Sequence, residues 1–140
     1  MQKPKLLLFS DWFYPGYKAG GPIKSVTNLS IALQKEIDVY VFTADTDLNE
    51  TQPYQNIQSN KWIKPIANCD VQVYYCSKTN ITKNKISEII KEVNPTVIYL
   101  NHLWSFWFVL QPLFIVWLKF KNIKIVLCHV VHCFQVHCIT

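Results

Sequence analysis

Apolar runs of strand length alternate with segments of helical periodicity along the first part of the chain. Lys5 to Phe9 (KLLLF) has the pattern of a buried strand, and from about Pro22 to Lys35 apolar residues recur every three to four positions, as on one face of a helix. A β-branched and aromatic run, Asp38 to Thr43 (DVYVFT), follows. These segments predict a strand, a crossover helix and a second strand parallel to the first.

The alternation continues after a long polar segment. Residues 44–68 are rich in Asp, Asn, Ser and Pro, which favours a loop in which only Lys61 to Lys64 could be extended. The next predicted elements are strands at Val71 to Cys76, Thr96 to Leu100 and Lys124 to Cys128, and a helix at Thr82 to Val93. Strands that alternate with helices predict one α/β domain over residues 1–128, with a Rossmann-like doubly wound parallel sheet.

The segment from Trp104 to Phe120 is apolar nearly throughout. It is shorter than the roughly 20 residues that a membrane span needs, and Gln111 and Pro112 interrupt it. We therefore predict a buried crossover helix that is capped by Ser105 and bent at Pro112. Its Trp and Phe content leaves peripheral contact with a membrane surface open as a second interpretation.

The charge of the chain adds little to this picture. Fourteen lysines against nine acids give a formal net charge of +5, but the lysines are scattered singly and there is no arginine. Because scattered charge is typical of a solvated surface, no nucleic-acid partner is expected. The apolar stretch before Asp11 is too short for a signal peptide, and five cysteines are an odd number for a disulfide framework. These features predict a cytoplasmic protein with reduced thiols.

The stretch from Phe9 to Ser25 is the predicted ligand site. It leaves a strand and enters a helix through Gly20, Gly21 and Pro22, so the backbone could approach a phosphate at the helix amides. The alternative is a flexible turn without a ligand. The glycines are too widely spaced for the G-x-G-x-x-G fingerprint of dinucleotide enzymes, although Asp45 stands where a ribose-binding acid would lie.

Four segments in this order resemble one known family: LLLFSDWFYPGYKAGGPIKSVTNLSIAL, VYVFTADTD, NPTVIYLNHLWSFWFVLQPL and KIVL. Their W-x-x-P, G-G-P helix start and V-I-Y-L-N strand end are similar to the N-terminal domain of the retaining nucleotide-sugar glycosyltransferases of family four. The resemblance spans Lys5 to Cys128. It implies the N-terminal half of a two-domain B-type glycosyltransferase fold, in which this domain mainly holds the acceptor and the other holds the nucleotide sugar.

The resemblance also implies binding roles for individual residues. Gly20 and Gly21 would approach the donor diphosphate. The acceptor or cleft residues would be Tyr14, Tyr17, Asn101 and His102. The implied partners are a nucleotide sugar and a glycan or lipid-linked acceptor, with no metal and no cofactor. The alternative interpretations are a loop histidine with satisfied hydrogen bonds and aromatic side chains packed under the loop. The sequence assigns no catalytic residue, donor sugar, acceptor, linkage or oligomeric state.

Residues 129–140 depart from the family, which usually continues with P-R-G-x-L-x-x-G-A-L. If Cys128 is encoded TGC, reading from its last base permits Pro-Arg-Gly-Thr-Leu-Leu-Ser-Gly-Ala-Leu, with the proline and the motif's two leucines forced by the observed residues. We therefore expect an aberrant tail, produced by a frameshift in the gene or in its sequencing that truncated a longer enzyme. The family's acidic donor-gripping region does not occur in the 140 residues, so the chain alone is expected to be inactive.

Two other functions stay open. One is a stand-alone sugar- or nucleotide-binding module. The other is a small metal-binding protein, because the tail gathers residue types that bind zinc: Cys128, His129, His132, Cys133, His137 and Cys138. These residues lack the separated C-x2-C pairs of zinc sites and lie in one short run, so no metal site is predicted.

Overall fold

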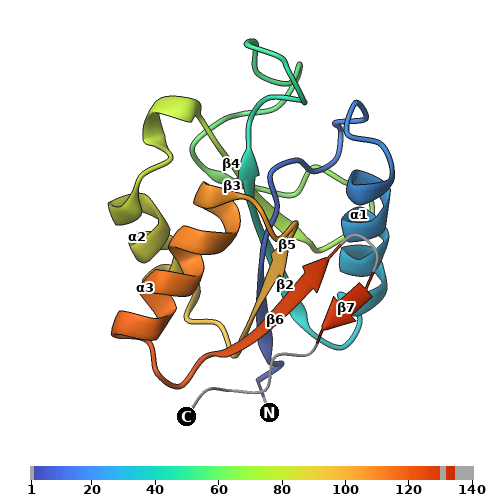
Figure 1. Ribbon diagram of the computed structural model, residues 1–140. Helices are drawn as coiled ribbons and strands as arrows, with labels where there is room; N and C mark the ends of the chain where they lie inside the picture. The colour runs from blue at the N-terminus through green and yellow to red at the C-terminus, as the bar shows by residue number, and fades with distance from the viewer. Residues whose placement is uncertain (1, 130–131, 135–140) are drawn as a thin grey trace.

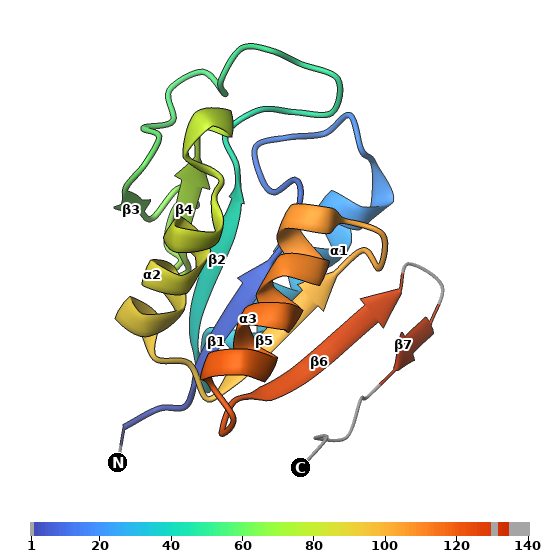
Figure 2. The same ribbon diagram turned by 60° about the vertical axis from the view of Figure 1, so that its left-hand side comes forward.

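One seven-stranded sheet with helices on both faces makes up the fold (Figures 1 and 2). The computed structural model describes residues 2–129 and 132–134. The strands are β1 Lys5–Phe9, β2 Asp38–Ala44, β3 Trp62–Ile63, β4 Gln72–Cys76, β5 Val97–Asn101, β6 Lys124–His129 and β7 His132–Phe134. The helices are α1 Gly21–Leu33, the 3-10 turn η1 Lys78–Asn80, α2 Lys83–Val93, the π-helix η2 Phe106–Leu110 and α3 Gln111–Lys119.

The inner strands of the sheet are all parallel. In the order β3-β4-β2-β1-β5-β6-β7, only the pairs of β3 with β4 and of β6 with β7 are antiparallel. The chain moves outward from β1 to β2 and β4, then returns to the other side of β1 for β5 and β6, so the strand order reverses between β1 and β5. The predicted α/β fold is confirmed, and this order is compatible with a Rossmann-like sheet.

Both faces of the sheet are buried, as the near-continuous apolar strands require. Successive residues of β1 point to opposite faces: Leu7 and Phe9 pack with α2 and α3, whereas Leu6 and Leu8 pack on the side of α1. Figure 1 shows α1 on one side of the sheet and α2 with α3 on the other. The long loop after β2 also agrees with prediction, since Trp62–Ile63 is its extended part.

The prediction of a buried helix from Trp104 to Phe120 is partly wrong. It consists of two helical pieces, η2 and α3, and only one stripe of it faces the core, including Phe108, Val109, Ile115 and Val116. Ser105 caps the start as predicted, because its hydroxyl accepts a hydrogen bond from the Phe108 amide. The irregular part is a π-helix that precedes Pro112. A segment that is apolar all round gives no periodicity from which the buried side could be chosen.

The end of the chain also differs from expectation. Strand β6 runs one residue beyond the predicted end, and the backbone of β7 pairs with it so that Leu127 lies opposite Phe134. The sequence did not predict β7. The hypothetical zinc ligands His137 and Cys138, together with the side chains of His129, His132 and Cys133, lie outside the described residues.

Candidate functional site

The carboxyl ends of β1 and β5 bring together an acid and a histidine. Asp11 comes two residues after β1, and His102 follows the last residue of β5, Asn101. His102 Nδ1 lies 3.7 Å from Asp11 Oδ2. These strands are the neighbours between which the strand order reverses, which is where open α/β sheets bind their ligands.

The Asp11 carboxylate is only half satisfied. Its Oδ1 accepts a hydrogen bond of 2.8 Å from the hydroxyl of Ser105, 94 positions later in the chain. Its Oδ2 is buried and has no hydrogen-bond partner among the described residues. Burial raises the pKa of the Asp11 carboxyl above its ordinary value, and the Ser105 hydrogen bond and the His102 charge oppose that rise only in part. A buried acceptor left open in this way is suited to a ligand's hydroxyl or amine.

His102 has an unusual backbone. Its φ is 76°, in the left-handed region that side chains with a Cβ rarely adopt. The other non-glycine residues of the described chain with positive φ are all asparagine, which tolerates this region: Asn49, Asn56, Asn60, Asn68 and Asn94. His102 is therefore the exception, held by hydrogen bonds from its amide to the Cys128 carbonyl and from the Ser105 amide to its own carbonyl. Strain of this kind gathers at functional sites.

The His102 ring lies between Asp11 and the aromatic loop. Its Nδ1 is buried without a hydrogen-bond partner in the described part of the chain, while the side chain as a whole is 40% exposed. The ring centroid is 6.3 Å from that of Trp12. The ring thus has one buried edge facing an acid and an open part that a ligand can reach.

A cavity of about 680 Å³ opens beside this pair. Asp11, Trp12, Asp47 and Trp107 are among the residues of its wall. The remaining lining residues are Ala44, Thr46, Leu48, Asn49, Glu50, Thr51, Lys78, Ile81 and Phe108. Carboxylates, amide and hydroxyl groups beside tryptophan rings are the side chains that bind sugars, because they match hydroxyl groups and the apolar faces of the rings.

The loop after β1 is fixed by its neighbours. The Asp47 carboxylate accepts hydrogen bonds from the amides of Tyr17, at 2.9 Å, and Lys18, at 3.2 Å. Burial alone would raise the pKa of Asp47, but these amides, the Leu48 amide and the Lys18 charge lower it below its usual value. The Tyr75 hydroxyl donates to the Tyr14 carbonyl. The loop is therefore anchored along its length, and its tip residue Tyr17 is 75% exposed.

Gly20 and Gly21 stand at the start of α1. Gly20 has φ 68° and ψ −123°, a conformation essentially confined to glycine, and a Cβ added at either glycine would meet no atom within 4 Å. No side chain of the described residues caps this helix end. Gly20 is therefore required by the backbone, whereas Gly21 leaves space in front of the helix.

The predicted site residues are thus spread around the cavity. None of the six, Tyr14, Tyr17, Gly20, Gly21, Asn101 and His102, lines the cavity itself among the described residues. His102 touches it through its partner Asp11, and Tyr17 through Asp47. Asn101 is buried. Asp45 is also buried, and it accepts a hydrogen bond from the Ser59 hydroxyl, so it is not available to a ribose.

Sequence reasoning missed Asp11, Ser105 and Trp107. Asp11 lies two residues after the apolar strand, and that position alone was a usable signal. Ser105 was predicted only as a helix cap. Its hydroxyl has two roles, because it accepts a hydrogen bond from the Phe108 amide and donates one to the Asp11 carboxylate. Nothing in the local sequence pairs residues so far apart.

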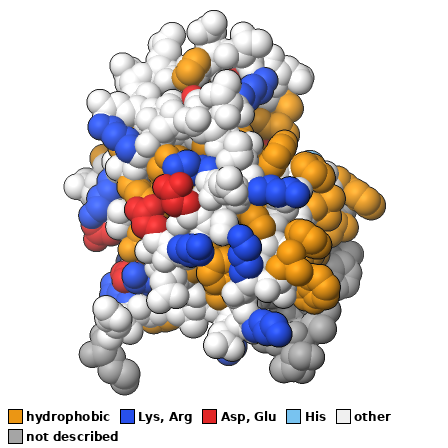
Figure 3. Space-filling model, turned by 90° about the vertical axis from the view of Figure 1, so that its left-hand side faces the viewer, with side chains coloured by type: hydrophobic (Ala, Val, Ile, Leu, Met, Phe, Trp, Pro, Cys, Tyr) orange, Lys and Arg blue, Asp and Glu red, His pale blue; other side chains and the backbone are white. Residues whose placement is uncertain are grey.

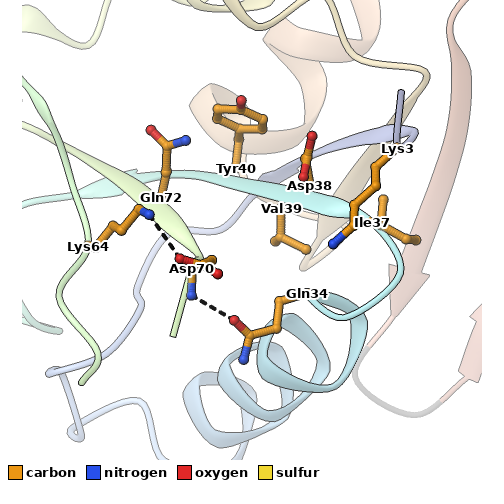
Figure 4. A pocket seen from close by; sticks show the side chains of 9 residues that line it. All are labelled: Lys3, Gln34, Ile37, Asp38, Val39, Tyr40, Lys64, Asp70 and Gln72. Carbon is orange, nitrogen blue, oxygen red and sulfur yellow. Dashed lines mark hydrogen bonds and ion pairs between the residues drawn. The ribbon is translucent and has the colours of Figure 1, made fainter. Parts of the chain in front are cut away.

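A second cavity, of about 230 Å³, lies at the amino ends of the strands (Figure 4). Its acid Asp70 is bound on both sides: the carboxylate accepts from Lys64 Nζ at 2.9 Å, and the amide donates to the Gln34 side-chain oxygen at 2.7 Å. Figure 4 shows these three residues turned toward one another. None of its lining residues carries a buried polar atom without a partner in the described chain, so it makes no comparable demand for a ligand.

Three further observations concern metal ligands, membrane-spanning helices and similar proteins. Among the described residues, no three His, Cys, Asp or Glu side chains come together as metal ligands. No helix in the described part of the chain is long and apolar enough to cross a membrane. Comparison with protein-family models, with curated proteins and with solved structures found no match to this chain.

Proposed function

We propose that this chain forms the acceptor-side domain of a retaining glycosyltransferase, which moves a sugar from a nucleotide donor to a glycan or lipid-linked acceptor. The observation that carries the proposal is the position of the Asp11–His102 pair at the reversal of strand order, with Asp11 on the wall of a cavity of about 680 Å³. Open parallel sheets bind ligands at this point because the strand ends leave a crevice there.

The side chains of the cavity support a sugar as the ligand. Trp12 and Trp107 offer aromatic surface on which a sugar ring can stack, and Asn49 and Thr51 offer hydrogen-bonding groups for its hydroxyls. Asp11 Oδ2 would accept a hydrogen bond from one more hydroxyl, since this buried oxygen has no hydrogen-bond partner in the described chain and lies 3.7 Å from His102 Nδ1. The open start of α1 would face the donor diphosphate with its amides and its partial positive charge.

In this proposal the nucleotide is held mainly by a facing domain. The buried Asp45, bonded to Ser59, gives little support to a complete nucleotide site within these residues. The 140 residues alone are therefore expected to bind ligands without turning them over. A lipid-linked acceptor would bring the domain to the inner face of a membrane.

Titration of the ¹⁵N-labelled chain, followed by amide NMR, tests the proposal. The probes are UDP-glucose, GDP-mannose, inorganic pyrophosphate and a panel of neutral oligosaccharides. Saccharides should shift the signals of Trp12 and His102, and the diphosphates those of Gly20 and Gly21. Trp12→Ala should weaken the saccharide response at least fivefold, because the loss of one stacking surface costs about 1 kcal/mol or more.

Asp70→Asn is the matched control, because it alters an acid of the other cavity. It should leave all responses unchanged. Shifts centred on Asp70 and Gln72, or none at saturating probe, would contradict the proposed site. Efficient sugar transfer by the 140-residue chain would instead contradict the division of labour between two domains, and tight binding without a facing domain would favour a stand-alone binding module.

A further inference from the structure

Eight large apolar side chains lie exposed on one surface of η2 and α3 and on the turn before them. We call this surface the apolar face. Its residues are Trp104, Phe106, Trp107, Leu110, Leu113, Phe114, Trp117 and Leu118. Trp104 is 78% exposed and Trp117 is 66% exposed. Figure 3 shows hydrophobic side chains gathered on this side of the molecule. A monomeric domain rarely exposes so many large apolar side chains together.

The segment that carries the apolar face has charge of one sign. From residue 93 to the end of the sequence there is no aspartate or glutamate. Lys119 ends α3, and Lys121 and Lys124 follow within the next turn and strand, all of them exposed. The segment of the apolar face therefore carries three cations near its end and no acid.

This combination fits an anionic lipid surface better than a second copy of the chain. Helices with Trp, Phe and Leu on one side and lysines beside them lie in the headgroup region, where tryptophan is enriched and lysines attract anionic lipids. Two copies packed face to face would bring the lysines of this segment together, and the segment has no acids to pair with them. The segment is too short to cross the bilayer, so it would lie on it.

We propose that the apolar face docks on a membrane that contains anionic lipids. Trp107 belongs both to this face and to the wall of the candidate cavity, so docking would bring the cavity mouth to the level of the lipid headgroups. The inference goes beyond the glycosyltransferase proposal, because the docking surface can bind lipid whatever ligand the cavity takes.

Vesicle binding by the 140-residue chain tests the inference. Sedimentation with vesicles of phosphatidylcholine alone is compared with vesicles of phosphatidylcholine and phosphatidylglycerol in equal parts. The chain should bind the anionic vesicles more tightly, and its tryptophan emission should shift to shorter wavelength on binding. The double variant Trp104→Gln/Trp117→Gln should lower the partition coefficient at least tenfold. Because both rings are exposed, replacing them leaves the core intact.

Ile31→Gln is the control for the aromatic variant, because Ile31 is an exposed apolar residue of α1 on the opposite side of the sheet. Its binding should equal that of the wild type. Lys119→Gln/Lys121→Gln should weaken binding to anionic vesicles by roughly fivefold for each lysine at low salt. Lys24→Gln/Lys35→Gln, which removes two lysines on the side of α1, should have less effect.

Three results would overturn the inference: no binding to anionic vesicles, equal binding to neutral and anionic vesicles, or loss of binding that is the same for the Ile31 and Trp variants. Self-association that the Trp variants abolish, without vesicle binding, would assign the apolar face to a second copy instead. Saccharide titration of the same variants separates the two proposals, because Trp104 and Trp117 do not line the cavity.

Discussion

The two ends of the parallel sheet carry acids that differ in pairing and in burial: the side chain of Asp70 is 86% exposed, whereas that of Asp11 is 22% exposed. At the amino ends, Asp70 is bound by Lys64 and Gln34. At the carboxyl ends, Asp11 Oδ2 and His102 Nδ1 face each other at 3.7 Å, and neither has a hydrogen-bond partner among the described residues. Because buried polar groups in native proteins are nearly always paired, the carboxyl end is the one that we propose as the ligand site.

Backbone conformation separates the same two ends. Asn94, which ends α2 at the amino side of β5, has φ 49°, and asparagine suits that region. His102, at the other end of β5, has φ 76°, although histidine does not tolerate this region as well as asparagine does. Gly20 has a conformation that only glycine tolerates. The comparison teaches that the carboxyl end combines unmet hydrogen bonds with backbone strain, and strain persists where function requires it.

The largest effect is expected for Gly20→Ala. A Cβ at φ 68° and ψ −123° should lower the free energy of unfolding by about 2 kcal/mol, although no atom blocks it. Gly21→Ala is the matched control and should change it by less than about 1 kcal/mol, in the stabilising direction, because Gly21 lies in the first turn of α1. Urea unfolding measures both. Equal effects of the two variants would show that the backbone at Gly20 is not strained.

An exchange of residues between the two ends of β5 should give effects of opposite sign. His102→Asn should raise the free energy of unfolding by roughly 0.5–1 kcal/mol, because asparagine tolerates positive φ, while the saccharide response falls. Asn94→His should lower it by a similar amount of about 1 kcal/mol. Thermal unfolding of both variants, with saccharide titration of the first, is the measurement. If His102→Asn lowered the free energy of unfolding instead, the imidazole would contribute to stability, and the prediction of a strained histidine would be wrong.

The smallest effects are expected for the two acids, and their pH dependence has opposite sign. The pKa of Asp11 is raised by burial, so its ionisation costs stability above the folded pKa, and this cost disappears below the ordinary value of 3.8. Asp11→Asn should therefore be more stable than the wild type at pH 7, by an amount that shrinks as the pH falls toward 4.

Asp70 should behave in the reverse way. Its hydrogen bond with Lys64 lowers its pKa below 3.8, so it contributes stability above that value and loses it as the pH falls through the folded pKa. Asp70→Asn should be slightly less stable than the wild type at pH 7, with a difference that salt reduces and acid removes. Urea unfolding of Asp11→Asn and Asp70→Asn across pH 3–7 measures both effects. If the two variants differed from the wild type in the same direction, the electrostatic contrast between the two ends of the sheet would be contradicted.

Local sequence patterns predicted most of the elements. The strands at Lys5–Phe9 and Asp38–Ala44 and the helix at Lys83–Val93 agree with their predicted positions within one or two residues, since short-range periodicity and capping determine where such elements form. The parallel arrangement of the first two strands also followed, because a crossover helix joins them. The loop between Phe9 and Ser25 lies at the carboxyl edge as predicted, for the same reason.

The contacts that make the site could not be predicted in this way. Asp11 and Ser105 are 94 positions apart, and they meet only because β5 is inserted beside β1 and not at the edge of the sheet. Side-chain periodicity contains no information on strand order. The positive φ of His102 is likewise held by the hydrogen bonds of its own backbone, from its amide to the Cys128 carbonyl and from the Ser105 amide to its carbonyl, and does not follow from its residue type.

By itself, then, the sequence determined the α/β alternation and the edge of the sheet at which the loop between Phe9 and Ser25 lies, because these depend on local propensity and on short connections. Only the tertiary structure decided which acid stands beside His102 and which side of the segment from Trp104 to Leu118 remains exposed. The physical reason is the same for both. A segment that is apolar all round, or an acid at a strand end, acquires its role from the elements that pack against it, and strand order selects those elements.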